Sequence, residues 1–198
     1  MSPVTHLLAS WIIAAKTTGN PRDCRLVTLA GIAPDLDGAG LVLDLIRNAV
    51  RGGEQFPLYQ HYHHYLLHGL AGGLVFAVLL AAFANQRWRV LLLALGVFHL
   101  HLLCDFAGSR GPSPDDVWPI FYFGPFDKDP MWMWKGQWRL DGWQNQLFSV
   151  GLLAWAMVLA VRVGHSVVGV FSRHFDDRLV RVLRDWTEKL RQRVPPPA

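Results

Sequence analysis

Histidine and aspartate stand together at the end of an apolar segment, in residues 98–111 (FHLHLLCDFAGSRG). If this segment is helical, His101 and Asp105 share one face, with Cβ atoms about 5–6 Å apart. An imidazole and a carboxylate at this spacing can bind one metal ion. Ionisable groups at membrane depth are costly, so each of them is a candidate for function.

Similar residues stand at the ends of other apolar runs: His61, His63, His64 and His68; Asp35 and Asp37; and His6. If the successive apolar runs enter or cross the membrane in alternating directions, all of these clusters lie on the same face of the membrane. Taken singly, a helical histidine is more often a packing residue, and Asp35 and Asp37 could simply cap the next helix. The joint pattern favours a shared metal site.

Mixed histidine and aspartate ligands suit zinc, and a larger share of carboxylate also suits manganese, magnesium or iron. A bound divalent ion lowers the pKa of its water to about 7 and polarises a phosphoryl or carbonyl oxygen. Hydrolysis at such a site needs no serine or cysteine nucleophile. Ser109 lacks the pattern of a nucleophile elbow, and Cys104 is flanked by leucine and aspartate, so neither residue is expected to act as a nucleophile.

The composition predicts a membrane protein with an all-α fold. Of the 198 residues, 52% are hydrophobic and 17% are charged, whereas about a quarter are charged in an average soluble domain. Residues 66–84 meet the roughly 18-residue criterion for a membrane helix, while 90–106 and 147–161 are slightly short. We therefore expect an integral membrane helical bundle with about three longer spans. The shorter runs 7–15 and 26–33 suit core or partly inserted helices.

Two further helices and a long loop complete the predicted domain of residues 1–171. Thr5 is expected to cap the first helix, and 41–50 has the pattern of an amphipathic helix. The loop 107–146 holds five tryptophans, which form either an aromatic belt at the membrane interface or a lid over the site. Arg87 and Arg89 lie in a basic loop between spans. The positive-inside rule puts this loop in the cytoplasm and the clusters at the outer face of the membrane.

Residues 172–198 are predicted to form a basic amphipathic helix with a proline-rich tail. Apolar residues recur from Phe175 to Leu190 at spacings of 3, 4 and 7, with arginines between them. Such a helix suits the anionic inner leaflet, which makes membrane lipids a partner and the C-terminus cytoplasmic. Packing on the protein's own loops is the alternative. The basic residues are confined to loops and this tail, so no nucleic acid is expected.

Short motifs in a fixed order carry a family resemblance: THLLAS at 5–10, PDLD at 34–37, HHYLLHGL at 63–70, HLLCD at 101–105 and WP at 118–119. They resemble the membrane-bound, metal-dependent hydrolases that include LexA-regulated inner-membrane proteins. That family is more distantly similar to zinc-dependent phospholipase C, an all-helical enzyme. The resemblance implies a hydrolase acting on an ester or phosphoester, with a lipid-like substrate.

The resemblance also implies a set of metal ligands: His6, Asp35, His63, His68, His101 and Asp105. Asp37 is then a ligand or an outer-shell base. The family usually has His-Arg-Gly-x-Thr-His where this chain has residues 63–68, so the arginine and threonine are lost. His64 takes the place of that arginine, and we assign it a catalytic role alongside Asp37.

Some positions leave alternatives open. His63 and His68 are five apart and converge only if His63 precedes the helix, whereas His61, His64 and His68 share a face of a continuous helix. His99 points away from His101 and is expected in an outer shell or in packing. Arg110 could contact a substrate phosphate or pair with a nearby aspartate.

Two other classes of function compete with the hydrolase. One is a haem or metal carrier with no hydrolytic chemistry, in which His68 and His99 would supply axial ligands; the aspartates argue against haem. The other is a scaffold in which the polar cluster is only a buried hydrogen-bond network.

Overall fold

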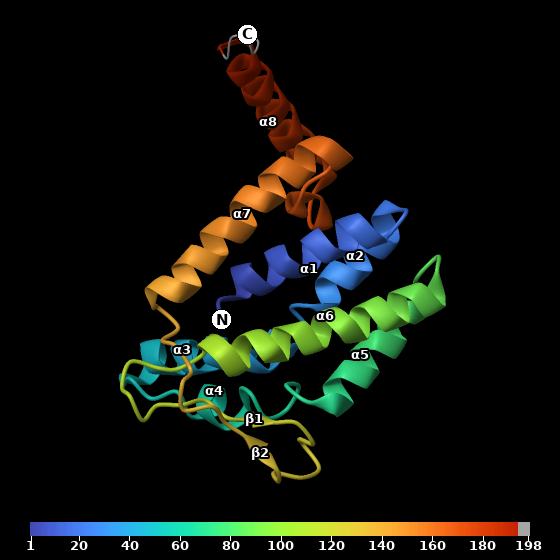
Figure 1. Ribbon diagram of the computed structural model, residues 1–198. Coiled ribbons are helices and arrows are strands. Elements are labelled where there is room, and N and C mark those ends of the chain that lie inside the picture. The colour runs from blue at the N-terminus through green and yellow to red at the C-terminus, as the bar shows by residue number, and fades with distance from the viewer. Residues whose placement is uncertain (194–198) are drawn as a thin grey trace.

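The computed structural model describes residues 1–193, which are mostly helical (Figure 1). The α-helices of this part of the chain are α1 (Pro3–Thr17), α2 (Pro21–Ala30), α3 (Gly40–Arg51), α4 (Pro57–Tyr62), α5 (Leu70–Ala82), α6 (Arg87–Gly108), α7 (Trp143–Val163) and α8 (Arg173–Arg193). Two short 3-10 helices, η1 (Pro34–Ala39) and η2 (Val167–Val170), lie between them. The long loop contains a two-stranded antiparallel sheet of β1 (Ile120–Phe121) and β2 (Met131–Trp132). The predicted proline-rich tail lies outside the described residues.

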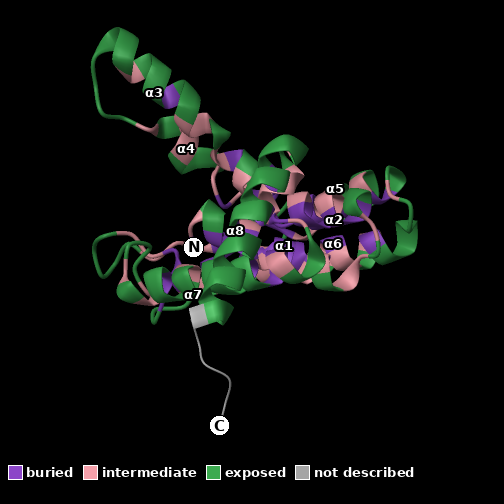
Figure 2. Ribbon diagram, turned by 90° about the horizontal axis from the view of Figure 1, so that it is seen from above, coloured by how far each residue is buried: buried purple, intermediate pink, exposed green. Residues whose placement is uncertain are grey.

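Helices α1, α2, α5 and α6 pack side by side, and α7 crosses α1 on its other side (Figure 1). Their shared core is apolar and includes Trp11, Val27, Val90 and Val97. Buried residues gather where these helices meet, whereas α3 stands away from the bundle and is largely exposed (Figure 2). Packing in this core places the start of α1 beside the end of α6. The predicted site residues lie at this end of the bundle.

Two helices, α6 and α7, are long and apolar enough to cross a membrane. A third candidate span is the bent pair formed by α2 and the segment Pro34–Arg51, whose halves meet at 61°. The predicted 66–84 span is wrong in its bounds, because α5 has only 13 residues and begins at Leu70. The amide of Leu70 donates to the carbonyl of Tyr122 (2.8 Å), so the long loop holds the preceding residues in turns.

Side-chain hydrogen bonds fix the starts of α1 and α6, the first through a local contact and the second through a distant residue. Ser2, not Thr5, caps α1: the Ser2 hydroxyl accepts the Thr5 amide hydrogen, while the Thr5 hydroxyl lies 2.7 Å from that of Ser149 on α7. Asp23 accepts hydrogen bonds from the amides just before α6, at Asn85 (2.8 Å) and Gln86 (3.0 Å). Since α6 then begins at Arg87, the predicted basic loop is shorter than expected.

Candidate metal centre

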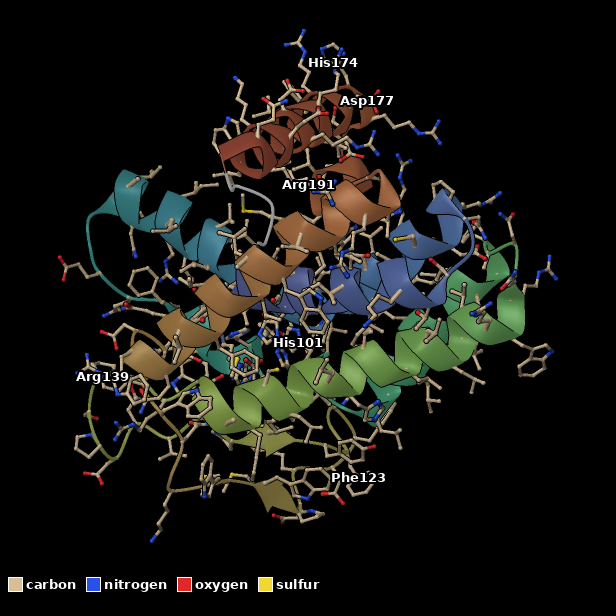
Figure 3. All side chains as sticks on the ribbon, turned by 45° about the horizontal axis from the view of Figure 1, so that its top comes forward. His101, Phe123, Arg139, His174, Asp177 and Arg191 are labelled. Atoms are coloured by element: carbon tan, nitrogen blue, oxygen red, sulfur yellow. The ribbon has the colours of Figure 1, made fainter. Side chains whose placement is uncertain are left out.

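Residues from four parts of the chain meet at the end of the bundle where α1 begins and α6 ends. The structure brings together all of the predicted site residues: His6 from α1; Asp35 and Asp37 from η1; His63, His64 and His68 from the turn between α4 and α5; and His101 and Asp105 from α6. His101 projects from α6 into the space between the helices (Figure 3). Most of these side chains are buried, so their charges and lone pairs are shielded from water.

Asp105 lies at the middle of the cluster. Its Oδ1 atom is 3.1 Å from His6 Nε2, and its Oδ2 atom is 3.0 Å from His101 Nε2 and 3.5 Å from His68 Nε2. The Met1 amino group and the Ser109 hydroxyl also contact Oδ1. One buried carboxylate therefore faces several nitrogen atoms at once, which is the arrangement of a cation site.

The tautomer of His101 follows from its partner on α2. Its Nδ1 atom lies 2.8 Å from the carbonyl oxygen of Gly31, which can only accept, so Nδ1 carries the proton. The lone pair of Nε2 in the neutral ring then faces two carboxylates, Asp105 Oδ2 at 3.0 Å and Asp35 Oδ1 at 3.6 Å. Acceptors facing acceptors repel unless a proton or a metal ion lies between them.

Asp37 orients two imidazoles. Its Oδ1 accepts from His63 Nδ1 (2.9 Å), and its Oδ2 accepts from His68 Nδ1 (2.9 Å) and from the Leu67 amide (3.1 Å). This fixes the proton of each ring on Nδ1 and leaves Nε2 to bind a metal, as outer-shell carboxylates do in metal sites. Of the two predicted roles for Asp37, the contacts favour the outer shell.

The turn between α4 and α5 explains how His63 and His68 converge. Helix α4 ends at Tyr62, His63 is its extended C-cap, and His64 has a left-handed backbone with φ of 66°. No continuous helix joins these positions, so the face shared by His61, His64 and His68 does not form. His61 is exposed, while His64 and His68 are buried with their rings stacked 4.4 Å apart.

Several buried polar atoms of the cluster have no hydrogen-bond partner among the described residues: His6 Nδ1, Asp35 Oδ2, His64 Nδ1, His68 Nε2 and His101 Nε2. Each such atom costs about 1–3 kcal/mol unless something satisfies it. Two overlapping groups could hold a metal ion, Asp35 with His68, His101 and Asp105, and His63 with His64 and His68. The donor set fits a divalent ion.

The two histidines of the turn titrate in opposite directions. Burial disfavours the charged form of His68, but hydrogen bonds and attraction from Asp105 and Asp37 outweigh burial and raise its pKa to about 9. Burial, aided by repulsion from His68, lowers the pKa of His64 well below its usual value. At neutral pH the metal-free cluster therefore holds a proton on His68 and keeps His64 neutral.

A cavity of about 470 Å³ adjoins the cluster. Asp35, His64 and Asp105 line one part of it, and apolar groups such as Leu41 and Trp118 line another. The Trp118 ring lies against His64, with centroids 5.0 Å apart. At Trp118 the predicted lid contacts the cluster, and it gives the cavity an apolar wall beside the histidines and aspartates.

The side chain of Gln137 links the tryptophan-rich loop to this end of α6, a role that the sequence did not predict. Its Nε2 donates to the carbonyl oxygens of Asp105 (2.9 Å) and Trp118 (3.2 Å), and its Oε1 accepts from the Trp118 amide (3.0 Å). The only sequence signal is a single amide side chain among aromatic residues. Gln137 thereby ties the cavity wall at Trp118 directly to the backbone of Asp105.

Two nearby residues lie outside the cluster. Both ring nitrogens of His99 are engaged, by the Leu95 carbonyl (2.8 Å) and the Tyr122 hydroxyl (3.0 Å), so of its two predicted roles the contacts favour packing. Arg110 lines a separate cavity with Arg139. Within residues 1–193, Arg110 forms no ion pair with an aspartate, so the predicted pair with a nearby aspartate is not formed, and contact with a substrate phosphate stays a prediction.

Comparison with known proteins places these features in a family. Neither the curated proteins nor the solved structures include a match to the chain. Residues 1–171, which contain every residue of the cluster, match the model of the YdjM inner membrane protein family. The chain therefore belongs to the YdjM inner membrane protein family.

Proposed function

We propose that the protein is a membrane-bound, metal-dependent hydrolase of ester or phosphoester bonds. The observation that carries this proposal is the pair of Nε2 atoms on His68 and His101, which have no hydrogen-bond partner among the described residues and which a metal ion would bind after displacing the proton that His68 holds in the metal-free cluster. Both rings have Nδ1 tied to an oxygen acceptor, and both aim Nε2 at Asp105 Oδ2. A divalent cation satisfies all of these acceptors together, and zinc suits the mixture of nitrogen and oxygen donors best.

The residues divide into separate roles. Asp35, His68, His101 and Asp105 would hold a metal ion, with His6 and His63 at either side of this group. The ion would supply a Lewis acid and a water molecule acidified to a pKa of about 7. His64 is neutral at physiological pH and lines the cavity, so it can accept a proton during hydrolysis.

The surroundings of the site favour a lipid-like substrate. The cavity has apolar walls at Leu41 and Trp118. Large apolar side chains are also exposed on α3, next to the cavity: Val42, Leu43, Leu45, Ile46 and Val50. Exposed apolar surface of this extent suits contact with lipid. A substrate held in the membrane could therefore reach the cavity from the side of α3.

Charge supports an orientation with the site at the outer face of the inner membrane. The other end of the bundle carries the basic residues at the starts of α2 and α6: Arg22, Arg25, Arg87 and Arg89. By the positive-inside rule this end faces the cytoplasm. The metal centre then opens on the opposite side.

The test is hydrolysis by the detergent-purified protein. Chromogenic phosphodiester and carboxyl ester substrates should be cleaved, chelation should abolish cleavage, and added zinc or manganese should restore it. His64→Ala should lower the rate about 100-fold with metal content unchanged, while His61→Ala, which alters an exposed histidine of the same turn, should have no effect. Metal-loaded protein that cleaves neither substrate class would contradict the proposal and favour a metal carrier. A chain that binds no metal would favour the structural network.

A further inference from the structure

Helix α8 packs against the end of α7 that lies far from the candidate metal centre (Figure 1). Side chains of the two helices line a groove between them. The groove has a volume of about 400 Å³. It lies at the end of a helix that is long and apolar enough to cross a membrane. The metal centre does not use this groove.

A tight connection fixes the position of α8. Gly164 ends α7 with a left-handed backbone (φ 81°), a conformation that glycine adopts without strain. Asp176 on α8 then accepts hydrogen bonds from the Ser166 amide (2.7 Å) and hydroxyl (2.6 Å). Val180 and Leu183 are buried on the same side of α8. The groove is therefore a built feature of the fold.

The walls of the groove are apolar along most of its length. Helix α7 contributes Met157, Val158 and Val161, and α8 contributes Leu183, Trp186 and Leu190. Trp186 and Leu190 are about 60% exposed, although both are large and apolar. The α8 wall, from residue 183 to residue 191, is about 12 Å long, close to the roughly 15 Å depth of hydrocarbon in one leaflet. One acyl chain would fill such a groove.

Two arginines also line the groove, Arg162 from the last turn of α7 and Arg191 from α8. Among the described residues neither guanidinium has an ion pair or a hydrogen bond within reach. In Figure 3, Arg191 lies beside α7, whereas His174 and Asp177 point away from the bundle. Guanidinium groups bind phosphate oxygens in a bidentate manner, so this pair is complementary to a phosphate group.

We propose that the groove between α7 and α8 is a binding site for one anionic phospholipid. An acyl chain packs against the apolar walls, and the headgroup phosphate binds Arg162 and Arg191. The basic character of this end of the bundle favours an anionic over a zwitterionic lipid. The site would secure α8 against α7, and it is independent of the hydrolase chemistry.

The test is native mass spectrometry of the full chain in a non-ionic detergent, titrated with phosphatidylglycerol or with phosphatidylcholine of the same acyl chains. Wild type should bind one phosphatidylglycerol in preference to phosphatidylcholine. Arg162→Gln with Arg191→Gln should weaken that binding about 30-fold, since each basic group near an anionic lipid contributes about a fivefold factor. Val158→Trp, which fills the groove and keeps both charges, should also abolish the bound lipid.

The matched control is Arg178→Gln with Arg181→Gln, which removes the same charge from α8 at positions that do not line the groove. This control should change affinity at most about threefold. Equal binding of the two lipids, an equal loss in the control variant, or unchanged binding in Val158→Trp would each overturn the proposal. None of these results depends on whether the chain binds metal or hydrolyses esters.

Discussion

The two ends of the molecule differ in which side chains they bury and which they expose. At the candidate metal centre, hydrogen bonds hold buried polar groups from α1, η1, the α4–α5 turn and α6 in place, as the Gly31 carbonyl holds His101 and Asp37 holds His68. At the α7–α8 end, apolar side chains such as Trp186 are exposed, and Arg162 and Arg191 are exposed with no ion pair to another described residue. The first end is preorganised by long-range contacts. The second is exposed, and in our proposal a bound lipid fills its groove.

The largest expected effect follows from removing the carboxylate at the middle of the preorganised end. Asp105→Ala takes away the contacts to His6, His68 and His101 together. We expect bound metal to fall below a tenth of the wild-type content, and hydrolysis to fall more than about 1,000-fold, because the ligand set loses its shared member. Elemental analysis and the ester assay measure these losses. Retained metal would remove Asp105 from the ligand set.

A smaller loss is expected when a ligand is misoriented rather than removed. Asp37→Asn keeps the shape but weakens the bonds that fix His63 and His68, and outer-shell changes of this kind typically reduce metal affinity about 10–100-fold. A competition titration against a chelator measures the affinity. Asp44→Asn is the control, since Asp44 is also a buried aspartate but bonds only the Tyr59 amide. Equal losses in both variants would mean that any buried aspartate has this effect.

The close packing of α1 against α2 can be disrupted by a substitution that changes no charged residue. A Cβ atom at Gly31 would collide with the Ser10 side chain, so Gly31→Ala must separate the helices and shift the carbonyl that orients His101. We expect a loss of about 3 kcal/mol in the free energy of unfolding, at the upper end for overpacking. Thermal unfolding in detergent measures it. Adding Ser10→Gly should restore most of the loss, and a failure to do so would contradict the proposed collision.

The smallest effects should be found on α8, where the two sides of one helix differ. Leu183→Ala removes a buried side chain and should lower the free energy of unfolding by about 2 kcal/mol. Leu190→Ala alters an exposed position and should change it by less than about 0.5 kcal/mol. The same unfolding measurement in lipid-free detergent compares the two variants. Equal losses would mean that Leu190 packs on the protein rather than on lipid.

The contrast between the ends also marks what could be predicted from the sequence. Helices α6, α7 and α8 follow local patterns of apolar and charged residues, and those patterns predicted them within a few residues. The clustering of histidines and aspartates was predicted from the order of the apolar runs. Both predictions needed only the periodicity of the chain and a count of crossings.

Features that depend on distant contacts were not predictable in this way. The apolar run from Leu66 onward has the composition of a continuous span, yet the Tyr122 carbonyl binds the Leu70 amide and keeps the residues before α5 in turns. The role of Gln137 likewise depends on partners at Asp105 and Trp118, which lie 32 and 19 residues away in the chain. Local propensity carries no information about such partners.

The most direct test of the account is the metal content of detergent-purified wild type beside two single histidine variants of α6, His101→Ala and His99→Ala. The two residues lie on one helix, but only His101 faces Asp105, while His99 bonds Tyr122. We predict zinc or manganese near one or two equivalents in wild type and in His99→Ala, and a loss of at least half of this metal in folded His101→Ala. Absence of metal from wild type after reconstitution with zinc, manganese and iron would contradict the metal centre.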